Sequence, residues 1–256
     1  MSFNRREFLN WLATGITSLS LASIPLAHGN APSKIKAIAF DAFAIFDPRP
    51  VFVLAEQLFP GKGTELSNVW RTRQFEYQWL RALSGQYADF WRATEDSLVY
   101  AAESLKLELT PDKRKQLMHA YLELKTWPDA PLVLRSLKNQ GIRLALLSNA
   151  TPTILEAGLI NSTIADVFEH VLSTDEIKTY KPDPRAYQMA VDVFGLKKED
   201  ILFVAFAGWD AAGAKSFGYI TFWVNRLALP HEQLSAVPDA VGNDLNGLLS
   251  FIKTLR

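Results

Sequence analysis

The stretch from Ile35 to Asp47, IKAIAFDAFAIFD, constrains the fold of this chain more than any other. Its mostly apolar residues end in a carboxylate, Asp41, and a run this short predicts a buried parallel strand rather than a helix. The carboxyl ends of strands in an open α/β sheet form the ligand crevice, so Asp41 is expected beside a binding site. A carboxylate there can act as a covalent nucleophile, because an ester intermediate divides one difficult step into two. The alternative is an Asp that only caps the following turn.

Apolar runs and helical patterns predict a doubly wound α/β fold. Four runs are typical of neighbouring parallel strands: 35–41, 142–147, 201–206 and 220–224. A weaker strand candidate follows at 167–172, and residues 48–126 carry only helical patterns. Because one strand precedes this helical block and the others follow it, we expect a Rossmann-like core with an inserted cap. The predicted core comprises residues 32–47 and 127–256, and the predicted helical cap comprises residues 48–126.

The composition excludes several kinds of site. The chain has 256 residues, of which 48% are hydrophobic and 21% charged, as in a globular protein with one domain or a domain plus an insertion. The basic and acidic residues number 27 each, so the zero net charge gives no reason to expect nucleic acid as a partner. The absence of cysteine excludes disulfides, thiol catalysis and thiolate metal sites.

The first 31 residues resemble a twin-arginine export signal. Arg5 and Arg6 precede an apolar run, Trp11 to Ala27, and small residues follow at the spacing of a signal-cleavage site. We therefore expect residues 1–31 to be a signal peptide, the twin-arginine export machinery to be a partner, and the mature protein to be periplasmic. The apolar run is short and mixed for a membrane span, and an uncleaved amphipathic anchor is the alternative.

Polar groups follow the predicted strands at the positions where the strands end. They are Asp41, the pair Ser148-Asn149, Lys181 and Asp210. Parallel strands bring these ends to one crevice, which makes the ordered set more specific than any single member. Taken alone, Lys181 is equally well explained as a loop lysine and Asp210 as a helix N-cap.

This ordered set resembles the haloacid dehalogenase superfamily over about residues 35–250, cap included. Within the superfamily, the chain is most similar to the L-2-haloacid dehalogenases, which have Tyr or a similar residue two positions after the nucleophile, where phosphatases have a second Asp. Phe43 occupies that position here. Other similar stretches are WRTRQFEYQWLRAL (Trp70–Leu83), FWRATEDSL (Phe90–Leu98), LALLSNATP (Leu144–Pro152), YKPDPRAY (Tyr180–Tyr187) and GWDAAGAKSFGYITFWVNR (Gly208–Arg226).

The resemblance implies three catalytic residues. Asp41 would attack the halogen-bearing carbon and form an ester. Lys181 would keep Asp41 ionised through its adjacent positive charge. Asp210 would position or activate the water that cleaves the ester. No metal or other cofactor is implied.

The resemblance also implies the residues that bind a small 2-haloacid. Arg71, from the cap, and Asn149 would cradle the leaving halide, because a fixed cation and an amide N–H are suitable donors. Taken alone, Arg71 is more simply read as a solvated or ion-paired surface group. Ser148 would hold the substrate carboxylate or the nucleophile. The remaining substrate-binding residues implied by the resemblance are Phe43, Phe75, Phe90, Tyr187 and Trp209.

Two departures from the family pattern affect the expected chemistry. Phe43 is followed by Ala44-Ile45, where the dehalogenases have a Gly-Thr pair, so a hydroxyl near the nucleophile is missing. Ala205 and Ala207 stand where Ser and Asn normally face the site. Since these changes remove polar groups that would handle water, we expect ester hydrolysis to slow more than ester formation.

The prediction is a metal-free hydrolytic dehalogenase for short 2-haloalkanoic acids. Related enzymes are often homodimers, so a homodimer is expected here as well. One alternative is a magnesium-dependent phosphatase, but Phe43 and Phe206 stand where its acidic residues would be. The other is a non-catalytic descendant that binds a small carboxylate or a partner in the same cleft.

Overall fold

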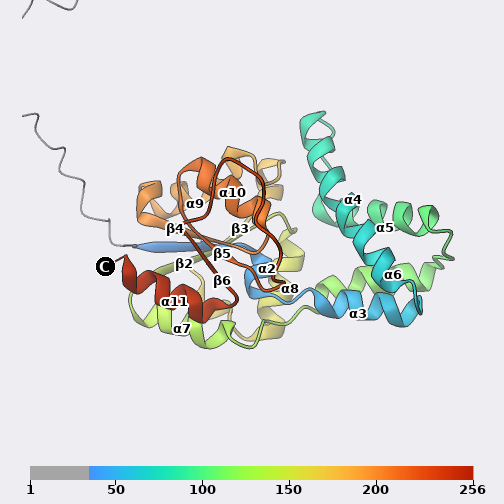
Figure 1. Ribbon diagram of the computed structural model, residues 1–256, viewed down its shortest axis with the longest axis horizontal. Helices are drawn as coiled ribbons and strands as arrows, with labels where there is room; N and C mark the ends of the chain where they lie inside the picture. Colours follow the sequence, from blue (N-terminus) through green and yellow to red (C-terminus); the bar gives the residue numbers. More distant parts are fainter. Residues whose placement is uncertain (1–34, 256) are drawn as a thin grey trace, which may run out of the picture. The chain divides into compact units, whose positions relative to one another are not determined.

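The computed structural model describes residues 35–255, so the predicted export signal lies outside the described part of the chain. Figure 1 shows the order of the elements. The strands are β1 (Ala37–Phe40), β2 (Arg143–Ser148), β3 (His170–Ser173), β4 (Ile201–Ala205), β5 (Ile220–Val224) and β6 (Ala240–Gly242). The helices are α2 (Ala42–Ile45), α3 (Arg49–Leu58), α4 (Gly63–Leu83), α5 (Phe90–Ser104), α6 (Pro111–His119), α7 (Ala130–Asn139), α8 (Pro152–Ser162), α9 (Pro184–Phe194), α10 (Gly208–Phe217) and α11 (Leu245–Thr254). The 3₁₀ turns are η2 (Ala120–Leu122), η3 (Ala165–Val167), η4 (Thr174–Ile177) and η5 (Lys198–Asp200).

The strands form one parallel sheet in the order β3-β2-β1-β4-β5-β6. The first strand of the chain therefore lies inside the sheet, with Phe40 aligned with Leu146 of β2 and with Val204 of β4. The chain continues from β1 toward β2 and from β4 toward β5, so the direction of winding reverses between β1 and β4. This reversal is the point at which open α/β sheets bind ligands. The predicted doubly wound parallel fold is confirmed.

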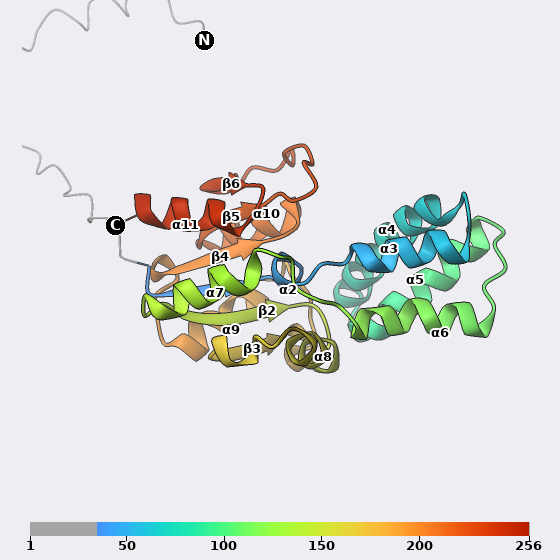
Figure 2. The same ribbon diagram turned by 90° about the horizontal axis from the view of Figure 1, so that it is seen from below.

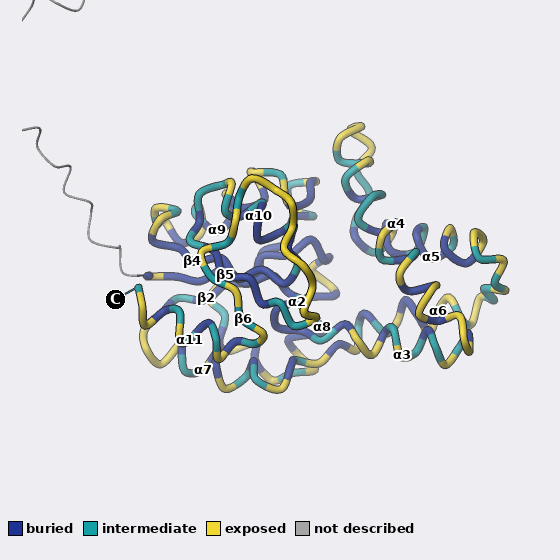
Figure 3. The backbone as a smooth tube through the Cα atoms, viewed as in Figure 1, coloured by how far each residue is buried: buried dark blue, intermediate teal, exposed yellow. Residues whose placement is uncertain are grey.

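Successive residues of each strand face two separate hydrophobic cores. On one face of the sheet, Ile38, Leu144 and every second residue from them along their strands pack with α7, α8 and α11. On the other face, Ala39, Phe203 and every second residue from them along their strands pack with α9 and α10. Figure 2 shows α7 and α11 together over the first face, and Figure 3 shows that the strands between the two layers are buried almost throughout. Burial on both faces explains why these strands are continuously apolar in the sequence.

Helices α3 to α6 and the turn η2 occupy the segment for which a cap was predicted, and they lie beyond the carboxyl ends of the strands (Figures 1 and 2). Capping residues define two of them, since Asp89 accepts from the N–H of Arg92 and Thr110 accepts from that of Lys113. The two segments that connect these helices to the core lie side by side, joined by a β-bridge between Phe46 and Thr126.

Strands β1, β2 and β4 differ from their predicted boundaries by one or two residues, and two other differences are larger. Strand β3 begins at His170, three residues after its predicted start, because Ala165–Val167 form a 3₁₀ turn instead. Strand β6 was not predicted, since Ala240–Gly242 form a short edge strand with no buried residue and therefore no apolar run. No helix within residues 35–255 is long and apolar enough to cross a membrane.

Candidate active site

Asp41 lies at the carboxyl end of β1, where the backbone leaves the sheet and enters α2. Its backbone N–H donates to the carbonyl of Val204 at 2.9 Å, which continues the pairing of β1 with β4. One carboxylate oxygen, Oδ2, accepts from the backbone N–H of Phe43 at 3.0 Å, and Oδ1 accepts from Nζ of Lys181 at 2.7 Å. The side chain is thus fixed and largely dehydrated, and it lines a cavity, which is the setting that a carboxylate nucleophile needs.

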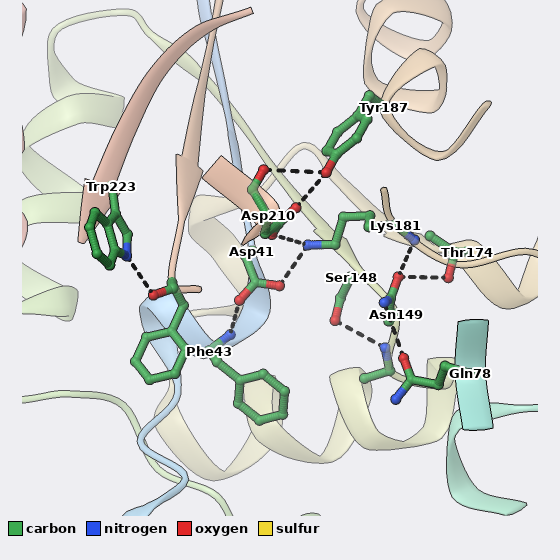
Figure 4. A network of polar contacts seen from close by, with 12 residues as sticks. Asp41, Phe43, Gln78, Ser148, Asn149, Thr174, Lys181, Tyr187, Asp210 and Trp223 are labelled. Atoms are coloured by element: carbon green, nitrogen blue, oxygen red, sulfur yellow. Dashed lines mark hydrogen bonds and ion pairs between the residues drawn. The ribbon is translucent and has the colours of Figure 1, made fainter. Parts of the chain in front are cut away.

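Lys181 is a buried cation between two carboxylates (Figure 4). Its Nζ lies 2.7 Å from Oδ1 of Asp41 and 2.6 Å from Oδ2 of Asp210. Burial by itself lowers the pKa of a lysine, but the negative charges of Asp210 and then Asp41 outweigh burial, and the pKa of Lys181 is raised. Lys181 is therefore protonated at neutral pH. The interpretation of this residue as a simple loop lysine is wrong.

Asp210 lies in the first turn of α10 and is almost completely buried. The N-cap of this helix is Ala207, so capping does not account for Asp210. Its Oδ1 accepts from the hydroxyl of Tyr187 at 2.7 Å, and its Oδ2 accepts from Lys181. Burial raises the pKa of Asp210 to about 6, Lys181 opposes that shift, and the charge of Asp41 adds to it. A carboxylate that titrates near neutrality is suited to accept a proton from water.

Ser148 and Asn149 follow one another at the carboxyl end of β2. The Ser148 hydroxyl accepts from the backbone N–H two residues later, at 3.1 Å. The Oδ1 of Asn149 accepts from the backbone N–H of Lys181 at 2.8 Å and from the hydroxyl of Thr174 at 3.3 Å. Its Nδ2 donates to Oε1 of Gln78 at 3.2 Å, so Asn149 connects the sheet to α4.

One face of α4 supplies the other side of the cavity. Arg71, Gln74, Phe75 and Gln78 follow the spacing of a single helix face, and all four line the cavity. The guanidinium carbon of Arg71 lies 6.0 Å from the ring centroid of Phe75, and within residues 35–255 it forms no ion pair with a carboxylate. Burial lowers the pKa of Arg71, yet arginine stays charged at any relevant pH. A half-buried cation without an acidic partner favours the binding of an anion. The interpretation of Arg71 as an ion-paired or solvated surface residue is therefore wrong.

Aromatic rings enclose the rest of the cavity. Phe43 lies 6.4 Å from Phe90 and 6.3 Å from Phe206 between ring centroids, and Phe75 meets Trp209 edge to face at 5.3 Å. The cavity that these rings line is small, with a volume of about 40 Å³. The cavity therefore suits a small ligand with an anionic group and an apolar body.

All predicted site residues except Tyr187 line this cavity. Tyr187 is fully buried, and its ring packs against Phe203 in the core on the α9 side of the sheet. Its hydroxyl reaches Asp210 from that core and not from the cavity, because α9 presents it to the opposite side of the carboxylate. The assignment of Tyr187 to substrate binding is therefore wrong, and its position is that of a support for Asp210.

The two alanines singled out in the sequence also differ in position. Ala207 lines the cavity, as expected for a residue that faces the site. Ala205 is completely buried in the core between the sheet and α9–α10, because successive residues of β4 alternate between the two faces. The expectation that both positions face the site therefore holds only for Ala207.

Sequence reasoning missed several residues that line the cavity, among them Gln74, Gln78 and Tyr121. The positions of the two glutamines in the sequence could have predicted that they line the cavity. They lie about one and two helical turns beyond Arg71 on α4, and therefore on the same face of the helix. Within residues 35–255 there is no group of three or more His, Cys, Asp or Glu side chains that could hold a metal ion.

Comparison with known proteins agrees with this arrangement. The sequence profile of the haloacid dehalogenase-like hydrolases matches residues 35–218, which span β1 to the end of α10 with its Asp210. The chain belongs to this family. Among haloacid dehalogenase-like hydrolases, it is 40% identical to the (S)-2-haloacid dehalogenase of Pseudomonas sp. (strain YL), over 86% of this chain and 95% of that relative.

Two solved structures of haloacid dehalogenases are similar to this one over nearly their whole length. The L-2-haloacid dehalogenase RSc1362 matches with a TM-score of 0.84 and 42% identity, covering 86% of this chain and 100% of that one. The L-2-haloacid dehalogenase of Xanthobacter autotrophicus with chloropropionic acid covalently bound matches with a TM-score of 0.79 and 33% identity, covering 87% and 100%. The family resemblance inferred from the sequence is confirmed.

Proposed function

We propose that this protein hydrolyses short 2-haloalkanoic acids to 2-hydroxy acids through an ester on Asp41. One observation carries the proposal: the fixed carboxylate of Asp41 and the guanidinium of Arg71, which forms no ion pair with a carboxylate within residues 35–255, line the same small, largely apolar cavity. A nucleophile and an anion-binding group on one cavity meet the needs of a substrate that loses halide. The (S)-2-haloacid dehalogenase relatives and the covalent chloropropionic acid complex of the Xanthobacter protein support it.

The first step forms the ester. A carboxylate oxygen of Asp41 attacks C2 of the acid, the carbon–halogen bond breaks, and the halide leaves with the bonding electron pair. Attack from the side opposite the halogen inverts the configuration of C2. Arg71 and Asn149 stabilise the charge that develops on the halogen, and Ser148 holds the substrate carboxylate. The aromatic rings keep water from competing with Asp41.

The second step cleaves the ester. A water molecule gives a proton to Asp210 while its oxygen attacks the carboxyl carbon of Asp41. The bond from that carbon to the ester oxygen breaks, and the 2-hydroxy acid leaves with this oxygen and a proton returned from Asp210. Asp41 is left as a carboxylic acid that contains the oxygen of the water, and it becomes a carboxylate again when it loses the second proton of the water to solvent. Lys181 stays protonated and holds both carboxylates in position throughout.

Halide release from the two enantiomers of 2-chloropropionate tests the proposal directly. We expect purified protein to release chloride from the (S) enantiomer and not from the (R) enantiomer, as measured by ion chromatography. No chloride and no ester with any short haloacid would favour the non-catalytic alternative. Hydrolysis of phosphate monoesters in place of haloacids would favour the phosphatase alternative.

We also propose that residues 1–31 direct export of the protein to the periplasm by the twin-arginine route. The paired Arg5 and Arg6 ahead of an apolar run support this proposal. We expect the periplasmic fraction to contain a protein whose N-terminus lies near residue 32. Replacing both arginines (Arg5→Lys with Arg6→Lys) should leave the full-length precursor in the cytoplasm. Equal export of both versions, measured by fractionation and N-terminal sequencing, would contradict the route.

A further inference from the structure

Gln78 is a buried amide at the cavity, and one of its hydrogen-bond donors is unused within residues 35–255. Its side chain is completely buried on the cavity face of α4. Its amide nitrogen Nε2 has no hydrogen-bond partner in the described part of the chain. Buried polar groups of proteins are nearly always paired, and an unpaired buried donor that lines a cavity indicates a group supplied by a ligand.

The neighbours of Gln78 settle which end of its amide is free. The backbone N–H of Lys181 can only donate, so the atom of Asn149 that faces it at 2.8 Å must be the acceptor Oδ1. Nδ2 of Asn149 therefore faces Gln78 and donates to Oε1 at 3.2 Å. Gln78 thus presents its oxygen to Asn149, and Figure 4 shows its nitrogen turned away from that contact.

The surroundings of this free nitrogen favour an anion. Gln78 lies two helical turns from Arg71 on the same face of α4, and Arg71 forms no ion pair with a carboxylate between residues 35 and 255. Asn149 uses one of its two amide hydrogens on Gln78, so its other hydrogen remains for a ligand. The two amides are joined by a hydrogen bond and line the same cavity, and Nε2 of Gln78 is bonded to the same carbon as the oxygen that Asn149 contacts.

We propose that Gln78 is a substrate-binding residue whose Nε2–H donates a hydrogen bond to the departing halide. The halide is the group on which charge develops during ester formation, so donors fixed beforehand act on the step itself. The substrate carboxylate has Ser148 as its proposed partner. This inference rests on the proposed function, because it names a further residue of the same site.

Binding of anions to the resting protein tests the inference without turnover. Sodium bromide supplies the halide alone, and sodium propionate supplies the carboxylate without a halogen. Each is titrated at constant ionic strength and followed by tryptophan fluorescence, since Trp209 lines the cavity.

Two variants separate the possible roles of Gln78. Gln78→Met keeps the length of the side chain, and Gln78→Glu keeps an oxygen for Asn149 but removes the N–H donor.

We expect saturable bromide binding in the wild-type protein and about ten- to hundredfold weaker binding in both variants, the range for a hydrogen bond to a charged group. Propionate binding should stay near wild-type in Gln78→Met. The control Gln188→Met makes the same exchange at an exposed residue of α9, where the amide pairs with Asp192, and should change neither titration.

Three outcomes would overturn the inference. Bromide binding that survives in Gln78→Glu but not in Gln78→Met would show that Gln78 only positions Asn149. Weaker propionate binding with unchanged bromide binding would assign Gln78 to the carboxylate. Absence of saturable bromide binding in the wild-type protein would exclude a halide site. A failure of dehalogenation itself would be seen separately, as no halide release from 2-chloropropionate.

Discussion

Replacing Asp41 with asparagine is expected to reduce halide release from (S)-2-chloropropionate by a factor on the order of 10⁶, as when other enzymes lose a covalent nucleophile. The neutral amide cannot attack C2, while the cavity and Arg71 remain in place. The measurement is chloride release over hours at high protein concentration, together with intact-protein mass spectrometry. We expect neither chloride nor an added mass.

A matched control exists within the chain. Asp239 accepts from Lys215 at 2.6 Å and from the backbone N–H of Thr221 at 2.8 Å, much as Asp41 accepts from Lys181 and Phe43. Asp239 is exposed and does not line the cavity. Asp239→Asn should therefore retain wild-type halide release. Normal release from Asp41→Asn would remove Asp41 from the mechanism.

Replacing Asp210 with asparagine is expected to trap the ester. Ester formation depends on Asp41 and Arg71, whereas hydrolysis depends on a base, and positioned acid–base assistance is worth ~10²–10⁴-fold. The variant should release about one halide per protein molecule and then nearly stop. Mass spectrometry should find the added acid on the peptide that contains Asp41. Asp112→Asn, at an exposed first-turn carboxylate of α6, is the control and should turn over normally.

The wild-type protein should show a milder form of the same behaviour. The methyl group of Ala207 lines the cavity where a polar residue could orient water, so a measurable fraction of ester should accumulate during turnover. Ala207→Asn should shrink that fraction and raise steady-state halide release. Rapid turnover of the wild-type protein without any trapped ester would show that Asp210 and Lys181 suffice to handle the water.

The pKa of Asp210 gives the hydrolysis step a defined pH dependence. Burial raises this pKa to about 6, and only the deprotonated carboxylate can accept a proton from water. Hydrolysis should therefore increase as the pH rises through about 6 and level off above it. At pH 5 the protonated form of Asp210 predominates, so the wild-type ester should accumulate there. An ester fraction that is the same at pH 5 and pH 8 would contradict Asp210 as the base.

Local patterns in the sequence determined the fold and grouped the polar residues of the site that follow the strands. The apolar runs that end at Asp41 and at Ser148 predicted buried parallel strands, because burial on both faces requires apolar side chains at every position. Parallel strands place their carboxyl ends at one edge, so the order of the chain was enough to group the polar residues that follow them. The family resemblance added the aromatic residues of the cavity and Arg71, which composition and spacing alone would have left on the surface.

Only the tertiary structure decided which way individual side chains face and what they pair with. Tyr187 and Ala205 belong to the core behind the sheet, because the rotation of α9 and the alternation of β4 are set by packing on that face. The amide of Gln78 turns its oxygen toward the sheet because Asn149, 71 residues away, accepts from Lys181 and must therefore turn its own nitrogen toward α4. The pKa of Asp210 likewise depends on burial and on two charges brought together by the sheet. Side-chain pairing and pKa shifts depend on contacts between residues that are distant in the chain. A local sequence pattern predicts helices and strands but not these contacts.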